Sequence, residues 1–259
     1  MLKLATWNVN SLKIRLDQVL QWFQDNAIDI LAIQETKVTD ENFPSAIFTQ
    51  NNLHVSFIGQ KSYNGVAIIS RYPLHDTQTT VPDLHHDTQR RILITTICNI
   101  RLINLYVPNG SEVNSEKYHY KLNWLAKITN YIQQQYMHYK NIAIVGDFNI
   151  APTDQDVYNL EKWQNCVLVS DHERAAYQNL LNLGFIDSFR QLYSTIQEYS
   201  WWDYRAASFK RNHGLRIDHI LLSTALMPYC NQVIIDKNER DHERPSDHAP
   251  VIAFLQHEF

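Results

Sequence analysis

Short apolar runs that end on carboxylate or amide residues recur along this chain of 259 residues. The run Ile30–Gln34 leads directly to Glu35, and the run Ile142–Gly146 leads to Asp147 and Asn149. Apolar runs of this length, bounded by polar or turn-forming residues, predict buried strands. Because open α/β sheets place their chemistry where strands leave the sheet, the polar residues at these ends are candidates for a common site.

Two further segments place polar residues beside predicted strands. Asn8 ends the run Leu2–Asn8, and Asp247 and His248 precede the last apolar run, Val251–Leu255. The carboxylates of these segments are far apart in sequence, yet each adjoins a strand end. Carboxylates, amides and a single histidine favour Mg²⁺ over zinc as the bound ion. The segments together therefore suit one metal-assisted phosphodiester site.

The order of apolar runs and amphipathic segments predicts an α/β fold. Strands are expected over Leu2–Asn8, Ile28–Gln34, Val66–Ser70, Arg91–Cys98, Leu102–Tyr106, Asn141–Gly146, Ile217–Leu222 and Val251–Leu255. Helices are expected over Leu12–Asn26 with Ser11 as N-cap, over Glu116–Tyr139, and over Asp171–Leu183 with Gly184 as the stop. Both halves of the chain mix strands and helices, which predicts two packed mixed sheets with helices outside. Since no linker or fixed-period repeat interrupts the pattern, residues 1–259 are expected to form one domain.

Composition excludes several classes of protein. Apolar residues make up 44% and charged residues 19% of the chain, which is typical of a globular protein rather than a disordered one. No run of about 18 apolar residues occurs, so no membrane span is expected. The N-terminal residues do not resemble a signal peptide. The cysteines are odd in number and lack CxxC spacing, which argues against a zinc site or a disulfide framework. The unpaired cysteines fit a reducing cytoplasm.

The formal net charge of −4 counts mildly against nucleic acid as a partner, since many DNA-binding domains are basic. The objection weakens if a metal ion neutralises the acidic residues of the site. Basic residues do cluster in Arg90-Arg91, in Lys210-Arg211 with Arg216, and in Lys117 with Lys121. The alternative for each cluster is a solvated surface without a specific partner.

Several residues leave alternatives open when taken singly. A buried Glu35 carboxylate needs a partner, which a metal ion, an arginine or backbone amides would supply. Asn8 either adds an amide oxygen, orients that carboxylate, or forms a turn. Asp147 and Asn149 are two residues apart on extended backbone and so face one phosphate together, unless they form a simple turn. The Tyr106 hydroxyl reaches a phosphate, or the ring packs at a strand end.

The C-terminal third of the chain carries a histidine and a tryptophan pair. His248 suits contact with a phosphate oxygen or proton exchange near neutral pH. A second group must fix its tautomer, and Asp218 is the candidate because it leaves a predicted strand. The alternative for Asp247 and His248 is a surface loop. Trp201 and Trp202 face opposite ways on extended backbone, so one is core while the other stacks on a base or fills a gap in a duplex; alternatively, both are core.

Together these segments resemble the exonuclease III family, the bacterial branch of the endonuclease/exonuclease/phosphatase superfamily. The matching segments occur in the family's order: Thr6–Leu12, Leu31–Lys37, Gln89–Ile92, Asn104–Gly110, Gly146–Asp154, Ser200–Arg205, Gly214–Asp218 and Pro245–Pro250. The resemblance implies a four-layer α/β sandwich and Mg²⁺-dependent DNA repair, with Mn²⁺ able to substitute. The implied activities are cleavage of duplex DNA 5′ to abasic sites, 3′→5′ exonuclease action and removal of 3′ blocking groups. The expected location is the bacterial cytoplasm, in association with the nucleoid. The sequence carries no clear signal for an oligomer, so a monomer is the default expectation.

The resemblance also implies which residues surround the metal. Glu35 resembles the main metal ligand, with Asn8 beside it. Asp147, Asn149 and Asp247 are expected near the same ion. Asp147 further resembles the acidic group that either activates water or protonates the leaving oxygen.

The remaining implied roles concern the phosphate and the DNA. His248, positioned by Asp218 and Asp247, resembles the histidine that contacts the scissile phosphate. Tyr106 and Asn149 resemble groups that orient that phosphate. The residues expected to bind substrate are Arg90, Asn109 and Trp201, with Trp201 as the aromatic wall of an abasic-sugar pocket.

Local departures from the family pattern leave every catalytic group in place. Asn10-Ser11 replaces the Asn-Gly or Asp-Gly of many relatives, Trp202 replaces a smaller aromatic residue, and the segment after Asp154 is shorter than in some close relatives.

Two other functions are compatible with this fold. A lipid or inositol phosphoesterase would not need Gln89–Ile92, and a non-enzymatic nucleic-acid-binding regulator would not need an intact set of catalytic side chains.

Overall fold

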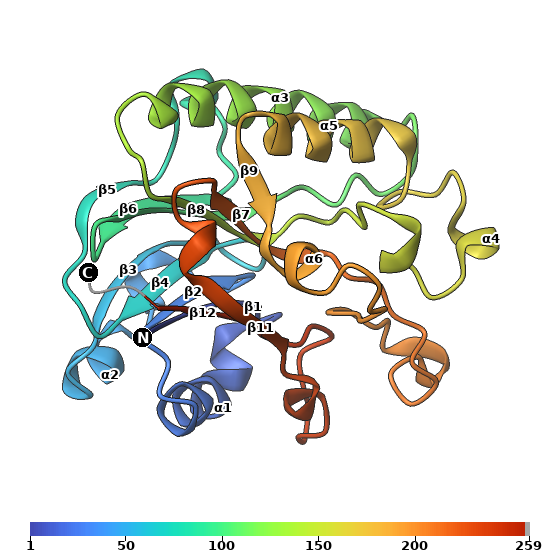
Figure 1. Ribbon diagram of the computed structural model, residues 1–259. Helices are drawn as coiled ribbons and strands as arrows, with labels where there is room; N and C mark the ends of the chain where they lie inside the picture. The colour runs from blue at the N-terminus through green and yellow to red at the C-terminus, as the bar shows by residue number, and fades with distance from the viewer. Residues whose placement is uncertain (257–259) are drawn as a thin grey trace.

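The computed structural model describes residues 1–256, which form two six-stranded sheets packed face to face (Figure 1). The strands of the first sheet are, in spatial order, β11 (Cys230–Ile235), β12 (Val251–Leu255), β1 (Leu2–Asn8), β2 (Ile30–Gln34), β4 (Val66–Ser70) and β3 (His54–Ile58). Those of the second are β5 (His75–Gln78), β6 (Ile92–Ile97), β7 (Ile100–Tyr106), β8 (Ile142–Asp147), β10 (Asp218–Ser223) and β9 (Phe185–Asp187).

Helices cover the outer faces of both sheets (Figure 1). The first sheet carries α1 (Leu12–Asp25) and α2 (Ser45–Gln50), and the second carries α3 (Glu116–Tyr136) and α5 (Asp171–Asn182). Two shorter helices, α4 (Leu160–Trp163) and α6 (Ser188–Leu192), lie in the connections. The predicted four-layer α/β sandwich is confirmed. Within residues 1–256, no helix is long and apolar enough to cross a membrane.

Alternation along the central strands divides their side chains between two apolar layers. On β1, Leu4 points between the sheets, whereas Trp7 points outward and packs edge-on against Trp22 of α1, with ring centroids 5.3 Å apart. On β8, Val145 joins the layer between the sheets and Ile144 joins the layer under α3 and α5. Both faces of these strands are buried, which explains their continuous apolar sequence.

Strand direction brings the ends of separate strands to one edge of the sandwich. β1 and β2 run parallel, with Asn8 beside Gln34. β7 and β8 also run parallel, with Tyr106 beside Asp147. β10 is antiparallel to β8 and starts at Asp218, directly opposite Asp147. The polar residues predicted at strand ends therefore gather at a single edge, as the strand-end rule requires.

A buried polar bridge joins the two sheets just behind this edge. The Gln34 amide donates to Thr6 Oγ1 at 2.9 Å within its own sheet and to Asn104 Oδ1 at 2.8 Å across the interface. Asn104 donates in turn to the backbone oxygens of Ile33 and Ala67, at 3.1 and 3.0 Å. Since buried polar groups need partners, this bridge favours one lateral alignment of the sheets and so fixes β2 relative to β7.

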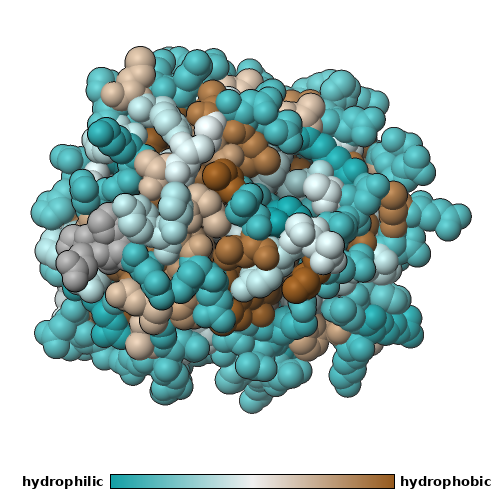
Figure 2. All heavy atoms as spheres, viewed as in Figure 1, coloured by the Kyte–Doolittle hydropathy of each residue, from teal (hydrophilic) through white to brown (hydrophobic). Residues whose placement is uncertain are grey.

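The face shown in Figure 1 is polar at its periphery and apolar near its middle. Figure 2 shows apolar side chains gathered there, over the region where α6 and β11 lie against each other.

Edge strands that were not predicted occur on both sheets, namely β3, β5, β9 and β11. These strands are short or lack a continuous apolar run, and every residue of β5 is exposed. Their pairing to a neighbouring strand, rather than their own pattern, defines them.

Some predicted boundaries are wrong. Ser11 precedes α1, but its φ of 93° is not that of a capping residue, and its side chain makes no capping hydrogen bond. Its backbone N–H instead donates to the Glu35 oxygen at 2.8 Å. Helix α3 ends at Tyr136 rather than Tyr139, and β10 starts at Asp218 rather than Ile217. The role of Ser11 depends on a contact with another strand, which local sequence cannot reveal.

Arg216 does not belong to a basic surface cluster. It is 1% exposed, and its guanidinium donates to Asp156 at 2.7 Å and to Asp187 at 3.1 and 2.7 Å. Arg190 donates to the same Asp156 oxygen at 2.6 Å. This network joins β9, α6, the segment just before β10 and the turn Asp154–Asp156. Of that predicted cluster, only Lys210 and Arg211 are exposed.

Replacing Asp156 by asparagine is expected to lower the free energy of unfolding by about 3–5 kcal/mol, because it leaves a buried guanidinium underpaired. Burial alone would raise the pKa of Asp156, but Arg216 and Arg190 outweigh it and hold the pKa well below its ordinary value. The stabilisation is therefore complete above about pH 3.9 and declines as the pH falls below it. Urea unfolding of the parent and the variant at several pH values measures the destabilisation and its dependence on pH. The destabilisation by Asp156→Asn should be smaller in acid.

Asp154→Asn is the matched control for this prediction. Asp154 lies in the same turn, but its side chain is 62% exposed where it pairs with Arg174. An exposed pair contributes at most about 1 kcal/mol, so this variant should unfold nearly like the parent. Equal destabilisation by the two substitutions would contradict the account of the buried network.

Candidate active site

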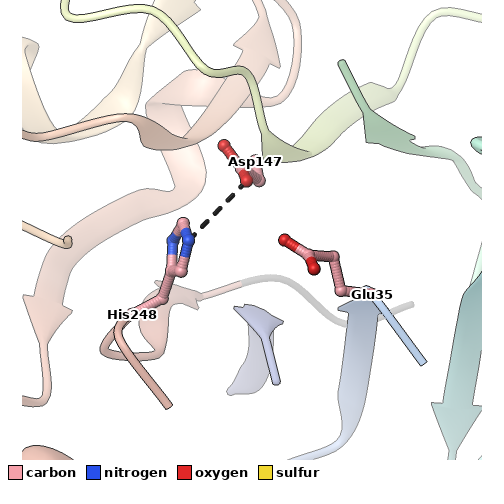
Figure 3. Close-up of side chains that lie close together, drawn as sticks. All are labelled: Glu35, Asp147 and His248. Atoms are coloured by element: carbon pink, nitrogen blue, oxygen red, sulfur yellow. Dashed lines mark ion pairs between the residues drawn. The ribbon is translucent and has the colours of Figure 1, made fainter. Parts of the chain in front are cut away.

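Three titratable side chains from different strands converge at the shared edge. Glu35 follows β2, Asp147 ends β8 and His248 precedes β12, and all three point into one space (Figure 3). A carboxylate oxygen from each acid and a ring nitrogen of His248 lie within 4.8 Å of one another. The sequence predicted that all three would share one site, and the structure brings them together.

The backbone at Glu35 and Asn149 has an uncommon conformation. Both residues have positive φ, 54° at Glu35 and 51° at Asn149, a region that costs free energy for residues other than glycine. Hydrogen bonds from Ser11 to the Glu35 carbonyl and from Thr36 to the Gly65 carbonyl, at 2.8 and 3.1 Å, support the first turn. The chain thus leaves β2 abruptly, and the Glu35 side chain turns toward β8.

Asn8 links the two carboxylates. Its amide nitrogen donates to Glu35 Oε1 at 2.8 Å and to Asp147 Oδ2 at 2.9 Å. Its oxygen accepts the backbone N–H of Asn10 at 3.0 Å. The sequence left open whether Asn8 supplies an amide oxygen, orients the Glu35 carboxylate or forms a turn. These contacts show that Asn8 orients the Glu35 carboxylate. Asn8 is fully buried, so its amide holds the acids at a fixed separation.

The donor chemistry fits a hard divalent ion. Glu35 and Asp147 offer carboxylate oxygens, the ligands that Mg²⁺ prefers. Lys37 already places an ammonium 2.8 Å from Glu35 Oε2 and donates to Asn10 Oδ1 at 2.5 Å. A positive charge therefore stands beside Glu35, where a metal ion would supply a larger one. Sequence reasoning did not select Lys37 or Asn10, although both lie in the matching segments.

Asp147 is the most perturbed acid of the group. It is 1% exposed, and its pKa is raised to about 7, mainly by burial and also by Asp218 and Glu35, although His248 and the Asn8 amide act to lower it. The Asn149 backbone N–H donates to Asp147 Oδ1 at 2.8 Å. An acid with a pKa near neutrality is suited to accept and return a proton.

His248 is held as a cation. Its Nδ1 lies 2.8 Å from Asp218 Oδ2, and its Nε2 lies 3.8 Å from Asp147 Oδ2. Burial alone would lower the pKa of His248, but Asp218, Asp147 and Asp247 together raise it to about 10. A doubly protonated imidazole has no lone pair for a metal. His248 is therefore a hydrogen-bond donor toward the space it shares with Asp147 and Glu35.

Asp218 is fixed on its strand by a residue that sequence reasoning passed over. Ser200 Oγ donates to Asp218 Oδ2 at 2.6 Å and accepts the backbone N–H groups of Ile217 and Asp218, each at 3.0 Å. The expected orientation of His248 by Asp218 is thus present in the geometry. Ser200 was visible in sequence only as the residue before the tryptophan pair.

Both oxygens of the Asp247 carboxylate accept hydrogen bonds from side chains outside the acid cluster. One oxygen accepts from Asn10 Nδ2 at 2.9 Å and the other from Trp201 Nε1 at 3.0 Å. Within the described residues, the one group of nearby acids and histidines suited to an ion does not include Asp247. Asp247 as a metal ligand stays a prediction, and its visible contacts orient Trp201. Trp201 is partly exposed and Trp202 fully buried, which matches the division of one core and one accessible ring.

Tyr106 lies beside the acids with an arginine on its ring. Burial raises the pKa of the Tyr106 hydroxyl well above its ordinary value, and Glu35 raises it further, so it is a hydrogen-bond donor at all ordinary pH values. The Arg91 guanidinium stacks 4.5 Å from the ring centroid and donates to the Tyr106 carbonyl at 3.2 Å. Arg90, the predicted substrate-binding arginine, anchors its backbone to Gln60 and Gly65. Of the two, Arg91 is the arginine whose side chain contacts Tyr106.

A second polar pair extends the site along the sheet edge. Asn109 Nδ2 donates to Asn149 Oδ1 at 3.0 Å, and Asn149 Nδ2 donates to the Val107 carbonyl at 3.0 Å. Asn109 is exposed and helps to line a hollow of about 420 Å³ that also includes Arg91 and the exposed Lys117. The predicted substrate-binding role of Asn109 is compatible with this position.

Lys121 is not part of a surface cluster with Lys117. Its side chain is completely buried under the Asn109–Asn149 pair. A signal was available, because Lys121 lies three residues before Trp124 and seven before Ile128, on the apolar face of its helix. A lysine in such a face requires a specific partner.

The sequence profile of the endonuclease/exonuclease/phosphatase family matches residues 5–248. The chain belongs to this family. Exodeoxyribonuclease III of Haemophilus influenzae is 36% identical over 265 aligned positions, covering 97% of this chain and 99% of the relative. The resemblance to the exonuclease III branch is thus confirmed, and the protein is a nuclease, a phosphodiester hydrolase.

Solved structures of relatives agree. A 3′ phosphatase from Neisseria, bound to a product DNA hairpin, superposes with a TM-score of 0.97 at 44% identity, covering 98% of this chain and 99% of that one. An AP endonuclease from Archaeoglobus fulgidus gives a TM-score of 0.95 at 38% identity, covering 99% and 100%. The fold and branch are therefore shared by enzymes whose names describe different reactions.

Proposed function

We propose that this protein is a Mg²⁺-dependent DNA-repair nuclease that hydrolyses bonds between phosphorus and a 3′ oxygen. The proposed substrates are duplex DNA with abasic sites, which it cuts 5′ to the lesion, and 3′ ends, from which it removes nucleotides or blocking groups. All of these reactions leave a 3′ hydroxyl, so one site serves them. We also propose that it acts as a monomer of one domain.

The observation that carries the proposal is the opposed pair of Asp147 and His248. A carboxylate and an imidazolium lie 3.8 Å apart, with Glu35 within 4.8 Å of both. A phosphate bound against this pair meets a proton acceptor in Asp147 and a charged donor in His248. A proton acceptor together with a charged donor suits in-line attack by water on phosphorus.

Each neighbouring residue has a role in that reaction. His248, Tyr106 and Asn149 donate hydrogen bonds to the phosphate oxygens and offset the negative charge that grows in the transition state. Asp147 handles the proton, and Asp218 keeps His248 charged and oriented. Because Asp147, Asn149, Asp218 and His248 are buried and held by hydrogen bonds, little reorganisation is needed when the phosphate binds.

Glu35 would hold the metal ion, with Asp147 and the Asn8 amide beside it. When bound, Mg²⁺, or Mn²⁺ in its place, neutralises phosphate charge and assists the leaving oxygen. The fit rests on two carboxylates with free lone pairs facing one space, and on Lys37, which shows that this position accepts a positive charge.

Residues around the acid cluster are proposed to select damaged DNA. Trp201, partly exposed and anchored to Asp247 at 3.0 Å, is suited to wall a pocket for a flipped sugar that lacks a base. Flipping costs less where no base must be unstacked, and a narrow pocket rejects an intact nucleotide. Arg90, Arg91 and Lys117 are placed to hold flanking phosphates, which predicts an affinity that falls with salt.

The names of the relatives support both proposed classes of substrate. The Neisseria protein is a 3′ phosphatase with a bound DNA hairpin, and the Archaeoglobus protein is an AP endonuclease. The alternative of a non-enzymatic regulator is disfavoured, since such a protein would not retain the complete set of site residues: Glu35, Asp147, Asn149, Asp218, Asp247 and His248.

Glu35→Gln tests the metal assignment. The variant should need at least about 10–100-fold more Mg²⁺ for half-maximal cleavage, since even indirect partners of a metal ligand cause losses of that size. Titration of Mg²⁺ against the initial rate measures the change. Glu41→Gln, on an exposed turn of the following loop, is the control and should behave like the parent. Parental Mg²⁺ dependence in Glu35→Gln would show that Glu35 does not hold the ion.

A further inference from the structure

A buried ammonium lies behind the phosphate-facing residues, outside the cluster that performs the chemistry. Lys121 of α3 is 0% exposed, and its Nζ donates to the carbonyls of Asn149 at 2.7 Å and Asn109 at 3.2 Å. Its third hydrogen bond goes to the carboxylate of Glu173 on α5. An ammonium has three donors, and all three are used.

Glu173 is equally buried and ties this ammonium to a third loop. One of its oxygens accepts the backbone N–H of Leu168 at 3.0 Å. The other accepts from the N–H and hydroxyl of Ser170, at 3.2 and 2.6 Å, in a capping box that starts α5. A buried ion pair is costly to desolvate unless its remaining donors and acceptors are satisfied, as they are here.

The two carbonyls that Lys121 holds belong to residues facing the proposed phosphate. The side chains of Asn109 and Asn149 are hydrogen-bonded to each other at 3.0 Å, and the Asn149 N–H fixes Asp147. Asn149 has a left-handed backbone with φ of 51°. A charged donor on its carbonyl supports a conformation that is otherwise unfavourable.

We propose that Lys121, paired with Glu173, is a positioning residue that fixes the loops of Asn109 and Asn149 so that both amides meet the phosphate in one arrangement. The pair has no direct access to the substrate. Loss of the ammonium frees two carbonyls at once and lets both loops shift. A displacement of about 1 Å at a group that contacts the reacting phosphate can cost about 10²-fold in rate.

The test compares Lys121→Met with Tyr118→Phe. Tyr118 is also buried on α3, and its hydroxyl is hydrogen-bonded to Ser170 Oγ at 2.6 Å, so its loss weakens the same α3–α5 contact without touching Asn109 or Asn149. This role rests on the proposed function, so rates are measured on abasic-site and 3′-phosphate duplexes. Hydrogen exchange of residues 107–111 and 147–151 is measured in parallel, because it needs no DNA.

Lys121→Met is expected to lower kcat about 10–100-fold, to change KM less than about threefold, and to speed exchange in both segments. Tyr118→Phe should lower the melting temperature and leave kcat and exchange in both segments near parental values. If Lys121→Met does not fold, the double variant Lys121→Met, Glu173→Met replaces it, because it removes both buried charges together. The same loss of kcat and the same faster exchange are expected for the double variant.

A folded variant with parental kcat, or with parental exchange in both segments, would overturn the positioning role. If the parent protein cleaves neither duplex, the proposed function fails, and the exchange comparison alone decides whether Lys121 holds the two loops.

Discussion

Asp147→Asn is expected to lower kcat by about 10²–10⁴-fold, the range associated with general acid–base catalysis. The substitution keeps the shape of the side chain but removes its ability to take a proton. It also places an amide where Asn8 and Asn149 both donate hydrogen bonds, so one donor loses its acceptor. DNA binding should be no weaker than in the parent, because a negative charge beside the phosphate is removed.

Single-turnover cleavage measures the chemical step, and a mobility-shift titration in Ca²⁺ or EDTA measures binding. Asp154→Asn, with its largely exposed side chain, is the control for both and should match the parent. A folded Asp147→Asn protein that cleaves within about threefold of the parental rate would remove Asp147 from the proton-transfer role.

His248→Gln is the second variant with a large expected effect, a loss of about 10²–10³-fold in kcat, comparable to the loss of one oxyanion-hole donor. Glutamine keeps a donor near the phosphate but removes the positive charge. The charge should matter because the site is buried, where electrostatic interactions are strong. The substitution also leaves Asp218 as a buried carboxylate without its cationic partner. The stability of the variant is therefore checked by thermal unfolding.

Asp218→Asn separates charge from orientation. Asp218 is the largest of the carboxylate contributions that raise the pKa of His248, so its removal should lower that pKa. In the proposed mechanism His248 acts as a cation. The pH at which activity falls on the alkaline side of the profile should therefore be lower in the variant than in the parent. The kcat/KM profile between about pH 6 and pH 10 shows the shift, whereas an alkaline limb that stays in place would mean that His248 does not act as an acid or donor there.

The strand-end rule located much of this site from sequence. Asn8, Glu35, Asp147 and Asp218 all end, begin or follow central strands, and parallel pairing brings them together. The apolar runs before them are continuous because both faces of each strand are buried. Sequence periodicity therefore predicted the central strands, and a sheet edge was enough to group their polar ends.

Other parts of the site depend on contacts that no local pattern encodes. The positive φ of Glu35 accompanies hydrogen bonds from Ser11 and Thr36 around the turn, contacts that the local sequence does not reveal. Ser200 became important only because its hydroxyl lies 2.6 Å from Asp218, eighteen positions later in the chain. Lys121 and Arg216 were grouped with surface charges, since a basic residue gives no sign of burial unless its position on an apolar face is weighed.

The short edge strands could not be predicted for a related reason. β5 is exposed at every residue and pairs with β6 through an irregular register. Such a strand exists because its neighbour offers unpaired backbone groups, not because its residues favour extension. Long-range pairing decides these segments, while burial on both faces decides the central ones.

The central claim is that the cluster of Glu35, Asp147 and His248 hydrolyses phosphate esters at a 3′ oxygen of DNA. The most direct test is a gel assay on an end-labelled duplex with one internal abasic site and, separately, a duplex with a 3′ phosphate, in Mg²⁺ and in EDTA. We predict one cut 5′ to the lesion that leaves a 3′ hydroxyl, together with loss of the 3′ phosphate. Both should be absent in EDTA and in Asp147→Asn. Duplexes left intact by folded, Mg²⁺-supplied parent protein would contradict the claim.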